Sequence, residues 1–391
     1  MEEIAKMKDV KKYAWYFPNW HVTSFNESGH GKGWTEWEVV KYAVPRFEGH
    51  SQPKKPLWGY EDETDPKVFE KKIQTAHDYG LDGFIFDFYW FKELGPHRRD
   101  ALDKGFLKAE NNELCEFGIM WANHVPVYAH PCGYMHDNNV LTTGSADVQM
   151  FYEITDYCIK HYFPKANYIR IDGKCYFGIW DLNKLIHDFG GIEGTAIMLN
   201  DFRRRAKEAG FEVHLACRKH SIPGFGGEKH PLDAGFEGEV GKEYYEEKVR
   251  QLGIDSAFNY TWAFSDVEEW PKIDYVPYRE KNIALYETES AYSNVPLDIT
   301  VSTGWDCSPR TCVSDRYERV GYPYSPIVVN NTPEEVEKAF AAAKKFMESD
   351  KFTGNMLTIS TWNEWTEGCY MEPDEEYGYG FLEAFKRVFV E

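Results

Sequence analysis

The feature that most constrains the fold is a repeated alternation of short strand-like runs with longer helical stretches. The runs are rich in aromatic and β-branched residues, as is typical of buried strands. The stretches between them carry apolar stripes and helix-end signals, such as acids early and lysines late in residues 333–347. Helices are expected at residues 65–80, 98–115, 146–163, 192–209 and 333–347. Strands are expected at residues 13–18, 83–90, 117–124, 174–181, 212–218, 257–262, 297–306 and 356–361.

Eight strands separated by helices predict an α/β fold, a (β/α)8 TIM barrel with long loops after its strands. An open doubly wound sheet is the topological alternative. The barrel is favoured because nearly every run ends in a polar or aromatic residue, and a barrel gathers those ends at one face. No repeat or linker divides the chain, so residues 1–391 are expected to form a single domain. The strand-end residues are His21, Asp87, His124, Asp181, Arg218, Trp262, Asp306 and Glu364.

The last strand-like run stops abruptly at Trp-Asn-Glu-Trp-Thr-Glu-Gly, residues 362–368. On a continuing strand, Glu364 and Glu367 would point to opposite faces, because side chains alternate. A turn at Trp365, with Gly368 free to adopt unusual dihedral angles, brings both carboxylates to one cavity. Two carboxylates are the minimum equipment for cleaving a glycosidic bond, and tryptophans commonly form the floor beneath sugar rings. The alternative is a solvated surface turn, which the two tryptophans disfavour.

Composition excludes several classes of protein. The chain has 391 residues, 42% of them hydrophobic, which supplies enough core for one decorated barrel. A formal net charge of −20 argues against nucleic acid and anionic membrane surfaces as partners. No apolar run is long enough to span a membrane. The first residues lack the apolar region of a signal peptide, so the expected location is the cytoplasm, or the periplasm if a leader has been trimmed.

Neither a cofactor nor a metal is expected. The eight cysteines are scattered without a Cys-x-x-Cys pair, which fits reduced thiols buried as small hydrophobes. No pair of histidines has the helical spacing and neighbouring acid of a hydrolytic zinc site, so hydrogen bonding to sugar or carboxylate is favoured. Residues 29–33 lack the context of a phosphate-binding loop. The histidines considered are His21, His50, His124, His130 and His136.

Three groups of motifs, spread over almost the whole chain, resemble the WbsX-like proteins. That family is related to glycoside hydrolase family 99, the endo-α-mannosidases. The Gly-Trp-Asp motif at residues 304–306, with Arg310, also fits the resemblance. The three groups are residues 33–37 with 49–56, residues 79–84 with 88–91, and residues 362–368 with Glu372-Pro373 and Tyr377-Gly378.

The resemblance implies a (β/α)8 barrel and a glycoside hydrolase. In the endo-α-mannosidases the two glutamates of the Asn-Glu-Trp-x-Glu-Gly motif carry the chemistry, and they correspond to Glu364 and Glu367 here. By resemblance, Glu367 protonates the departing oxygen and then activates water. Glu364 removes the proton from the sugar's own 2-hydroxyl, which closes onto the anomeric carbon as an epoxide. Water opens the epoxide with net retention, so the expected substrate is an α-linked glycan of mannose or rhamnose.

Two other functions stay open at this point. Some WbsX-like proteins are described as glycosyltransferases of polysaccharide assembly, although no Asp-x-Asp metal–nucleotide motif occurs here. A carbohydrate-binding protein on an inactive barrel is the other alternative, and the intact glutamate pair counts against it. Residues 123–131 replace the acidic, tryptophan-containing segment that many WbsX-like proteins carry after the third strand. The identity of the sugar therefore cannot be copied from relatives.

The expected partner is an oligosaccharide or polysaccharide. Glu36 lies between two tryptophans in a glycine-flanked loop and is a sugar-binding candidate, with an exposed loop acid as the alternative. Asp306 either contacts the ligand or forms an ion pair with the nearby Arg310. The expected substrate-binding residues are Trp20, His21, Trp34, Glu36, Trp37, Asp87, Tyr89, Asn123, His124, Trp262, Asp306, Asn363 and Trp365.

Overall fold

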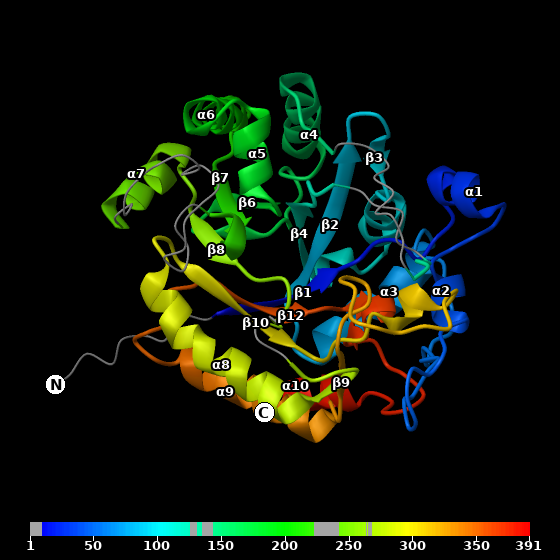
Figure 1. Ribbon diagram of the computed structural model, residues 1–391. Coiled ribbons are helices and arrows are strands. Elements are labelled where there is room, and N and C mark those ends of the chain that lie inside the picture. Colours follow the sequence, from blue (N-terminus) through cyan, green and yellow to red (C-terminus); the bar gives the residue numbers. More distant parts are fainter. Residues whose placement is uncertain (1–9, 126–130, 135–143, 223–241, 263, 265–267) are drawn as a thin grey trace.

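The computed structural model describes residues 10–125, 131–134, 144–222, 242–262, 264 and 268–391, and these form a closed parallel barrel (Figure 1). Ala14 of the first strand pairs with Phe84 on one side and Ile359 on the other, which closes the sheet. The expected (β/α)8 barrel is confirmed and the open sheet is excluded. Around the barrel the strands are β1 (Lys11–Tyr16), β2 (Gly83–Phe91), β4 (Glu116–Trp121), β6 (Lys174–Ile179), β7 (Val213–Arg218), β8 (Ser256–Phe258), β10 (Leu297–Ser302) and β12 (Met356–Ser360).

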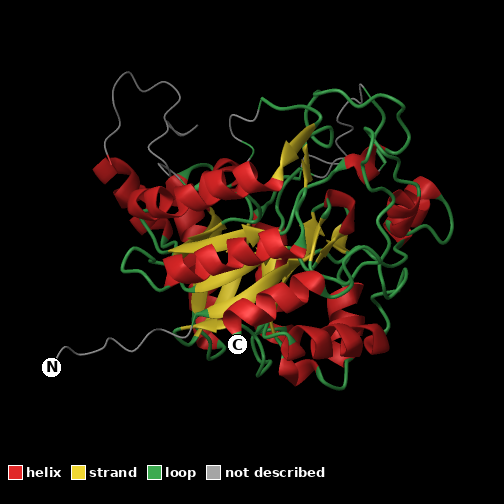
Figure 2. Ribbon diagram, turned by 90° about the horizontal axis from the view of Figure 1, so that it is seen from below, coloured by secondary structure: helices red, strands yellow, loops and turns green. Residues whose placement is uncertain are grey.

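Helices cover the outside of the strands (Figure 2). Four of the five expected helices are confirmed, and the sequence explains their ends: Asp65 caps α3 by accepting from the Lys67 N–H, and Thr332 caps α9 by accepting from the Glu335 N–H. Within the described part of the chain, no helix has the length and apolar character that crossing a membrane requires. The outer helices are α3 (Pro66–Asp78), α4 (Val148–His161), α5 (Leu182–Asp188), α6 (Ile192–Glu208), α7 (Lys242–Leu252), α8 (Tyr275–Tyr292), α9 (Pro333–Met347) and α10 (Gly380–Phe389).

The helix expected at residues 98–115 is wrong. Within these residues the chain instead forms only short helical turns, over Ala101–Gly105, Phe106–Lys108 and Asn112–Leu114. Gly105 and the Asn-Asn pair at 111–112 are poor helix formers. The chain also packs so closely that a side-chain carbon on Gly105 would lie 2.1 Å from the Glu63 carbonyl oxygen. Close approach of two backbones therefore takes the place of a helix here.

Side-chain alternation decides what fills the barrel. Tyr13 and Trp15 of β1 join an inner apolar cluster, whereas Ala14 and Tyr16 belong to the cluster between strands and helices. Every other strand of the barrel except β10 also contributes to the inner cluster, through Ile85, Met120, Tyr176, Ala216, Phe258 and Met356.

Long segments follow several strands at their carboxyl ends. The segment after β1 carries the short helices α1 (Ser24–His30) and α2 (Trp37–Lys41), and β2 continues into a hairpin with β3 (Gly95–His97). After β12, the antiparallel strands β13 (Asn363–Glu364) and β14 (Cys369–Tyr370) flank a tight turn. Smaller pieces are β5 (Arg170–Ile171), which pairs with β6, and the pair β9 (Lys272–Asp274) and β11 (Ile327–Val329).

Candidate active site

A cavity of about 440 Å³ lies at the carboxyl ends of the barrel strands, where enzymes of this fold carry their active sites. Four of the eight strand-end residues line it, namely Asp87, His124, Arg218 and Glu364. Alternation explains part of the lining, because Asp87 and Tyr89 continue the inward series that begins with Ile85.

The turn after β12 brings Glu364 and Glu367 into this cavity, as the sequence predicts. A short 3-10 turn covers Trp365–Glu367, and Gly368 ends it with φ of 61°. A side-chain carbon on Gly368 would lie 2.6 Å from Cβ of Asp306, so only glycine fits this turn. The hydroxyl of Thr361 accepts from the Glu364 N–H at 2.8 Å and fixes the start of the turn.

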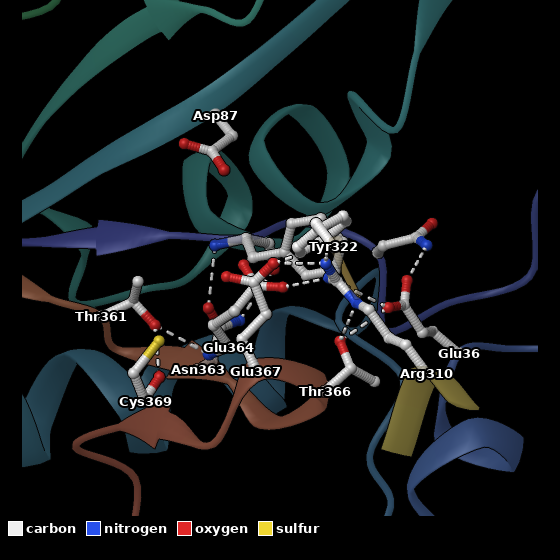
Figure 3. A network of polar contacts seen from close by, with 12 residues as sticks. Glu36, Asp87, Arg310, Tyr322, Thr361, Asn363, Glu364, Thr366, Glu367 and Cys369 are labelled. Carbon is white, nitrogen blue, oxygen red and sulfur yellow. Dashed lines mark hydrogen bonds and ion pairs between the residues drawn. The ribbon is translucent and has the colours of Figure 1, made fainter. Parts of the chain in front are cut away.

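Arg310, from the loop after β10, holds the two glutamates together (Figure 3). Its Nη2 lies 2.6 Å from Oε1 of Glu364, and its Nη1 donates to Oε1 of Glu367. Its Nε donates to the Thr366 hydroxyl at 3.1 Å, between the two glutamates in sequence. Tyr322 donates a further hydrogen bond to Oε1 of Glu367 at 2.7 Å. One guanidinium therefore sets the relative position of both carboxyl groups.

Asp306 does not pair with Arg310, which excludes the ion-pair alternative. Its carboxylate instead accepts from His50 at 2.8 Å, from Gln52 at 2.6 Å and from the Ser308 N–H at 2.9 Å. These partners hold the pKa of Asp306 below its usual value despite burial. Asp306 is not part of the cavity lining. Its contacts anchor the loop that presents Arg310.

The charges at the glutamate pair do not balance, because Arg310 also lies 3.5 Å from a third carboxylate, Glu36. Burial, followed by the charge of Glu367, raises the pKa of Glu364 well above its usual value, with Arg310 opposing. Burial also raises the pKa of Glu367, where Arg310 again opposes. Because these two desolvated carboxyl groups interact through one guanidinium, a first proton bound by either belongs to the pair, which titrates as a unit.

Asp87 approaches the pair from β2, across from Glu364 (Figure 3). Burial raises its pKa to about 8. Tyr260 lies between the two acids, with its hydroxyl 3.0 Å from Oδ2 of Asp87 and 3.3 Å from Oε2 of Glu364. A hydroxyl has one proton to donate. A protonated Asp87 can donate to Tyr260, which leaves the Tyr260 proton for Glu364.

Two predicted sugar ligands lie behind this surface rather than on it. Glu36 has no exposed area, accepts from Asn19 and from the Thr366 hydroxyl at 2.8 Å, and does not line the cavity. Asn363 is fully buried; its amide nitrogen donates to Phe17 O and its amide oxygen accepts from Phe17 N, at 2.9 and 2.8 Å. Both side chains hold the turn and the segment after β1 in place.

The predicted aromatic and polar ligands divide into two groups. Trp34, Tyr89 and His124 line the cavity, with Trp34 stacked on His30 at 4.0 Å between ring centroids. The others fill space between the barrel and its loops. Except in His21, whose two buried ring nitrogens have no hydrogen-bond partner among the described residues, their rings pack on other rings or their polar groups bond to backbone. This second group, which does not line the cavity, is Trp20, His21, Trp37, Asn123, Trp262 and Trp365.

Several lining residues are absent from the sequence predictions. Trp180 and Tyr260 follow β6 and β8 by one and two residues, and they continue the inward alternation of Tyr176 and Phe258. That alternation is a signal that could have found them. Arg98 and Tyr322 come from loops without a repeating pattern. His130 and His136 lie outside the described residues, within which no group of three or more potential metal ligands gathers.

Solved structures confirm the barrel fold. The family 99 endo-α-mannosidase of Bacteroides thetaiotaomicron, in complex with bis-tris propane, superposes with a TM-score of 0.56 at 12% identity, over 97% of this chain and 95% of that one. A glycoside hydrolase-like protein superposes with a TM-score of 0.59 at 15% identity, over 98% and 94%. Likeness at such low identity concerns the fold.

Sequence relatives also match nearly the whole chain. Uncharacterized protein WxcX, from two strains of Xanthomonas campestris pv. campestris, is 26% identical over 388 residues, which is 96% of this chain. The chain spans about half the length of these curated relatives, 49%. The model of the family described as Glycosyltransferase WbsX matches residues 12–385. The resemblance seen in the motifs is thereby confirmed, and the chain belongs to the WbsX family.

Proposed function

We propose that this protein is a glycoside hydrolase that cleaves α-linked glycans of manno configuration, mannose or rhamnose, with retention of configuration. One observation carries the proposal: Glu364 and Glu367 line the same cavity and share Arg310. A guanidinium that contacts both carboxyl groups keeps them within reach of one sugar ring. Aromatic side chains on the lining, such as Trp34 and Trp180, provide surfaces on which sugar rings stack.

The substrate decides which glutamate holds the shared proton. Without ligand, Glu367 accepts from Tyr322 and Arg310, which favours its charged form and leaves the proton to Glu364. A sugar 2-hydroxyl that donates to Glu364 lowers the pKa of that carboxyl group. A glycosidic oxygen only accepts hydrogen bonds, so it favours a protonated Glu367. Substrate binding thus prepares Glu364 as the base and Glu367 as the acid.

The reaction then proceeds in two balanced steps. Glu367 gives its proton to the glycosidic oxygen, while Glu364 takes the proton of the 2-hydroxyl. The anomeric bond to the leaving oxygen breaks as the 2-oxygen bonds to the anomeric carbon, forming an epoxide. Water then attacks the anomeric carbon, gives a proton to Glu367 and opens the epoxide, and Glu364 returns its proton to the 2-oxygen. Two inversions at one carbon give net retention.

A panel of α-mannan, rhamnose-containing and host-glycan oligosaccharides, with product masses measured, tests this proposal. We expect cleavage that is lowered by about a hundredfold or more in Glu364→Gln and in Glu367→Gln, with binding retained. Substrates methylated or deoxygenated at the 2-position of the reacting sugar should be inert. Near wild-type turnover by Glu364→Gln, or products of inverted configuration, would contradict the mechanism.

The same panel should include nucleotide-sugars, because of the family's description as glycosyltransferases. Transfer from a nucleotide-sugar without hydrolysis of any glycan would contradict the hydrolase proposal. Binding of glycans without turnover by the wild-type protein would contradict it too, and would favour a carbohydrate-binding role.

A further inference from the structure

One side of the cavity is a row of alternating rings and guanidinium groups, which we call the cationic wall. The Arg98 guanidinium lies 4.9 Å from the Tyr89 ring, and Tyr89 lies 6.0 Å from His124 between centroids. His124 lies 6.3 Å from Trp180, whose ring lies 4.4 Å from the Arg218 guanidinium. All five residues line the cavity, which Asp87 and Glu364 also line.

Neither arginine of the wall forms an ion pair or a hydrogen bond with a carboxylate in the described part of the chain, although the charge of Arg98 lowers the pKa of Asp87 from a distance. Arg98 contacts the rings of Phe17 and Tyr89, and its buried Nε has no hydrogen-bond partner there. Arg218 donates from Nε to the Trp180 carbonyl oxygen at 3.2 Å, and burial lowers its pKa. Asp181 is the nearby acid, and it caps α5 through the Lys184 N–H at 3.0 Å. A partly desolvated charge without a partner is costly.

Two further observations mark these arginines as unusual. Arg98 holds φ of 55°, a left-handed conformation that is unfavourable for a residue with a side chain. The protein as a whole carries a formal charge of −20, and its cavity holds Asp87, Glu364 and Glu367. Two cations without an ion pair on one wall of such a cavity would be compensated by a bound anion.

We propose that the cationic wall binds an acidic sugar, so that the glycan cleaved here carries a carboxylate group, as a uronic acid does. This inference rests on the proposed hydrolase function and names its substrate class. The carboxylate bonds to the guanidinium groups of Arg98 or Arg218, whose planar forks match its two oxygens. The sugar ring that carries it packs against Tyr89 or Trp180.

His124 gives the wall a second, neutral contact. Its Nδ1 lies 3.1 Å from the Val125 carbonyl oxygen and donates to it, which leaves Nε2 as an acceptor. Burial lowers the pKa of His124, so the ring is uncharged near neutral pH. A neutral acceptor between two cations fits a group that bears both an anion and hydroxyl donors. A uronic acid has both on one ring.

The test is a calorimetric binding experiment with matched ligands. The first is an oligosaccharide of alternating glucuronate and mannose; the second is the same oligosaccharide with its carboxyl groups reduced to alcohols. We expect the wild type to bind the acidic form roughly tenfold more tightly or better, the range of a charge-assisted hydrogen bond. Arg98→Gln and Arg218→Gln should each weaken that preference.

Arg204→Gln is the matched control, because Arg204 is an exposed arginine of α6 that pairs with Asp201 and Glu208 on the outer surface. This variant should keep the full preference. Equal affinity of the wild type for both forms overturns the inference, and so does a preference that survives in both Arg98→Gln and Arg218→Gln. The wild-type comparison stands even if a variant does not fold.

Two more ligands separate other sources of the anion. An ester-sulfated manno-oligosaccharide that outcompetes the uronate overturns the choice of a carboxylate. GDP-mannose that binds more tightly than the uronate, with loss in Arg98→Gln and Arg218→Gln, overturns the glycan assignment. Because binding is measured without turnover, a preference for the acidic form without hydrolysis sustains this inference while the hydrolase proposal fails. Hydrolysis of neutral glycans with no preference for the acidic form would sustain the hydrolase proposal and overturn this inference.

Discussion

The two sides of the cavity hold their charges in different ways. On the side formed by the turn after β12 and the loop after β10, Arg310 is in contact with Glu364 and Glu367, and the charges are paired inside the protein. On the cationic wall, Arg98 and Arg218 form no described ion pair with a carboxylate. Groups that are paired within the protein keep a fixed geometry when the ligand leaves, and catalytic groups require such preorganisation. Charged groups without an ion pair gain the most interaction energy from a bound ligand, which suits them to ligand recognition.

A second layer of charge lies behind the paired side. Lys72 of α3 is buried between Glu63 and Glu372, with its Nζ 2.7 and 2.6 Å from their oxygens. Asn363 donates to Glu63 at 2.9 Å, and Trp365 donates to Glu372 at 2.7 Å. The residues on either side of Glu364 are thus held by a buried ion cluster.

The largest effect is expected at Arg310. Arg310→Met should lower kcat by about a thousandfold, the scale of losing one preorganised electrostatic contact at a reacting group. Its charge lowers the pKa values of Glu364 and Glu367, so its removal should shift the pH profile of kcat/KM to higher pH. Arg310→Lys should restore part of the rate. An unshifted pH profile with near wild-type turnover would show that Arg310 does not control the two glutamates.

The next effect concerns the buried layer. Lys72→Met leaves two carboxylates without their cation and should lower the free energy of unfolding by about 3–5 kcal/mol. Urea denaturation at pH 8 measures this change. Lys67→Met is the control, since Lys67 lies on the same helix but is exposed and pairs only at the surface, with Glu70, so this variant should behave nearly as the wild type. Equal stability of the two variants would show that the layer does not support the turn.

Glu63 gives a pH dependence of smaller size. Burial raises its pKa to about 7 in the folded protein, with Lys72 opposing, whereas its usual value is 4.5. The folded protein therefore binds more protons through this group than the unfolded chain between these values. Stability should fall as pH rises from about 4.5 to 7, by up to about 3 kcal/mol. Glu63→Gln should lack this decline, whereas Glu70→Gln, on the exposed face of α3, should retain it.

The smallest effect is expected at Glu36. The sequence predicts a sugar contact, for which Glu36→Gln would raise KM more than it lowers kcat. The structure places Glu36 behind Thr366 and Arg310, where it positions the glutamate turn. We therefore expect kcat to fall by about tenfold at nearly constant KM. Glu38→Gln, on the outside of α2, is the control. A raised KM with unchanged kcat would show that Glu36 contacts the sugar after all.

The barrel and the glutamate turn could be predicted because each leaves a local pattern. Strand runs alternate with helical stretches, and Gly368 ends a turn that no other residue fits. The lining of the cavity was harder to predict. Position at a strand end predicts Trp262 and Asp306 as ligand contacts, but Trp262 packs in the core and Asp306 anchors a loop. The inward alternation of β6 and β8 instead indicates Trp180 and Tyr260, which do line the cavity.

Other contacts left no local signal at all. Arg310 meets Glu364 across 54 residues of chain, and Lys72 meets Glu372 across a still longer separation. Asp306 and Arg310 are close in sequence, and proximity suggested a pair, yet His50 takes that carboxylate from another loop. Which buried charges form ion pairs depends on the tertiary structure, so the sequence identifies the charged residues but not their pairing.

The β2–β3 hairpin has a consequence for engineering. β3 pairs with β2 alone and lies outside the closed sheet, and Arg98 follows it directly. The glutamates come from the other end of the chain, after β12. Arg98 of the cationic wall and the two glutamates therefore come from separate segments, so exchange of residues 92–98 is a route to altering ligand preference while leaving the glutamate turn unchanged.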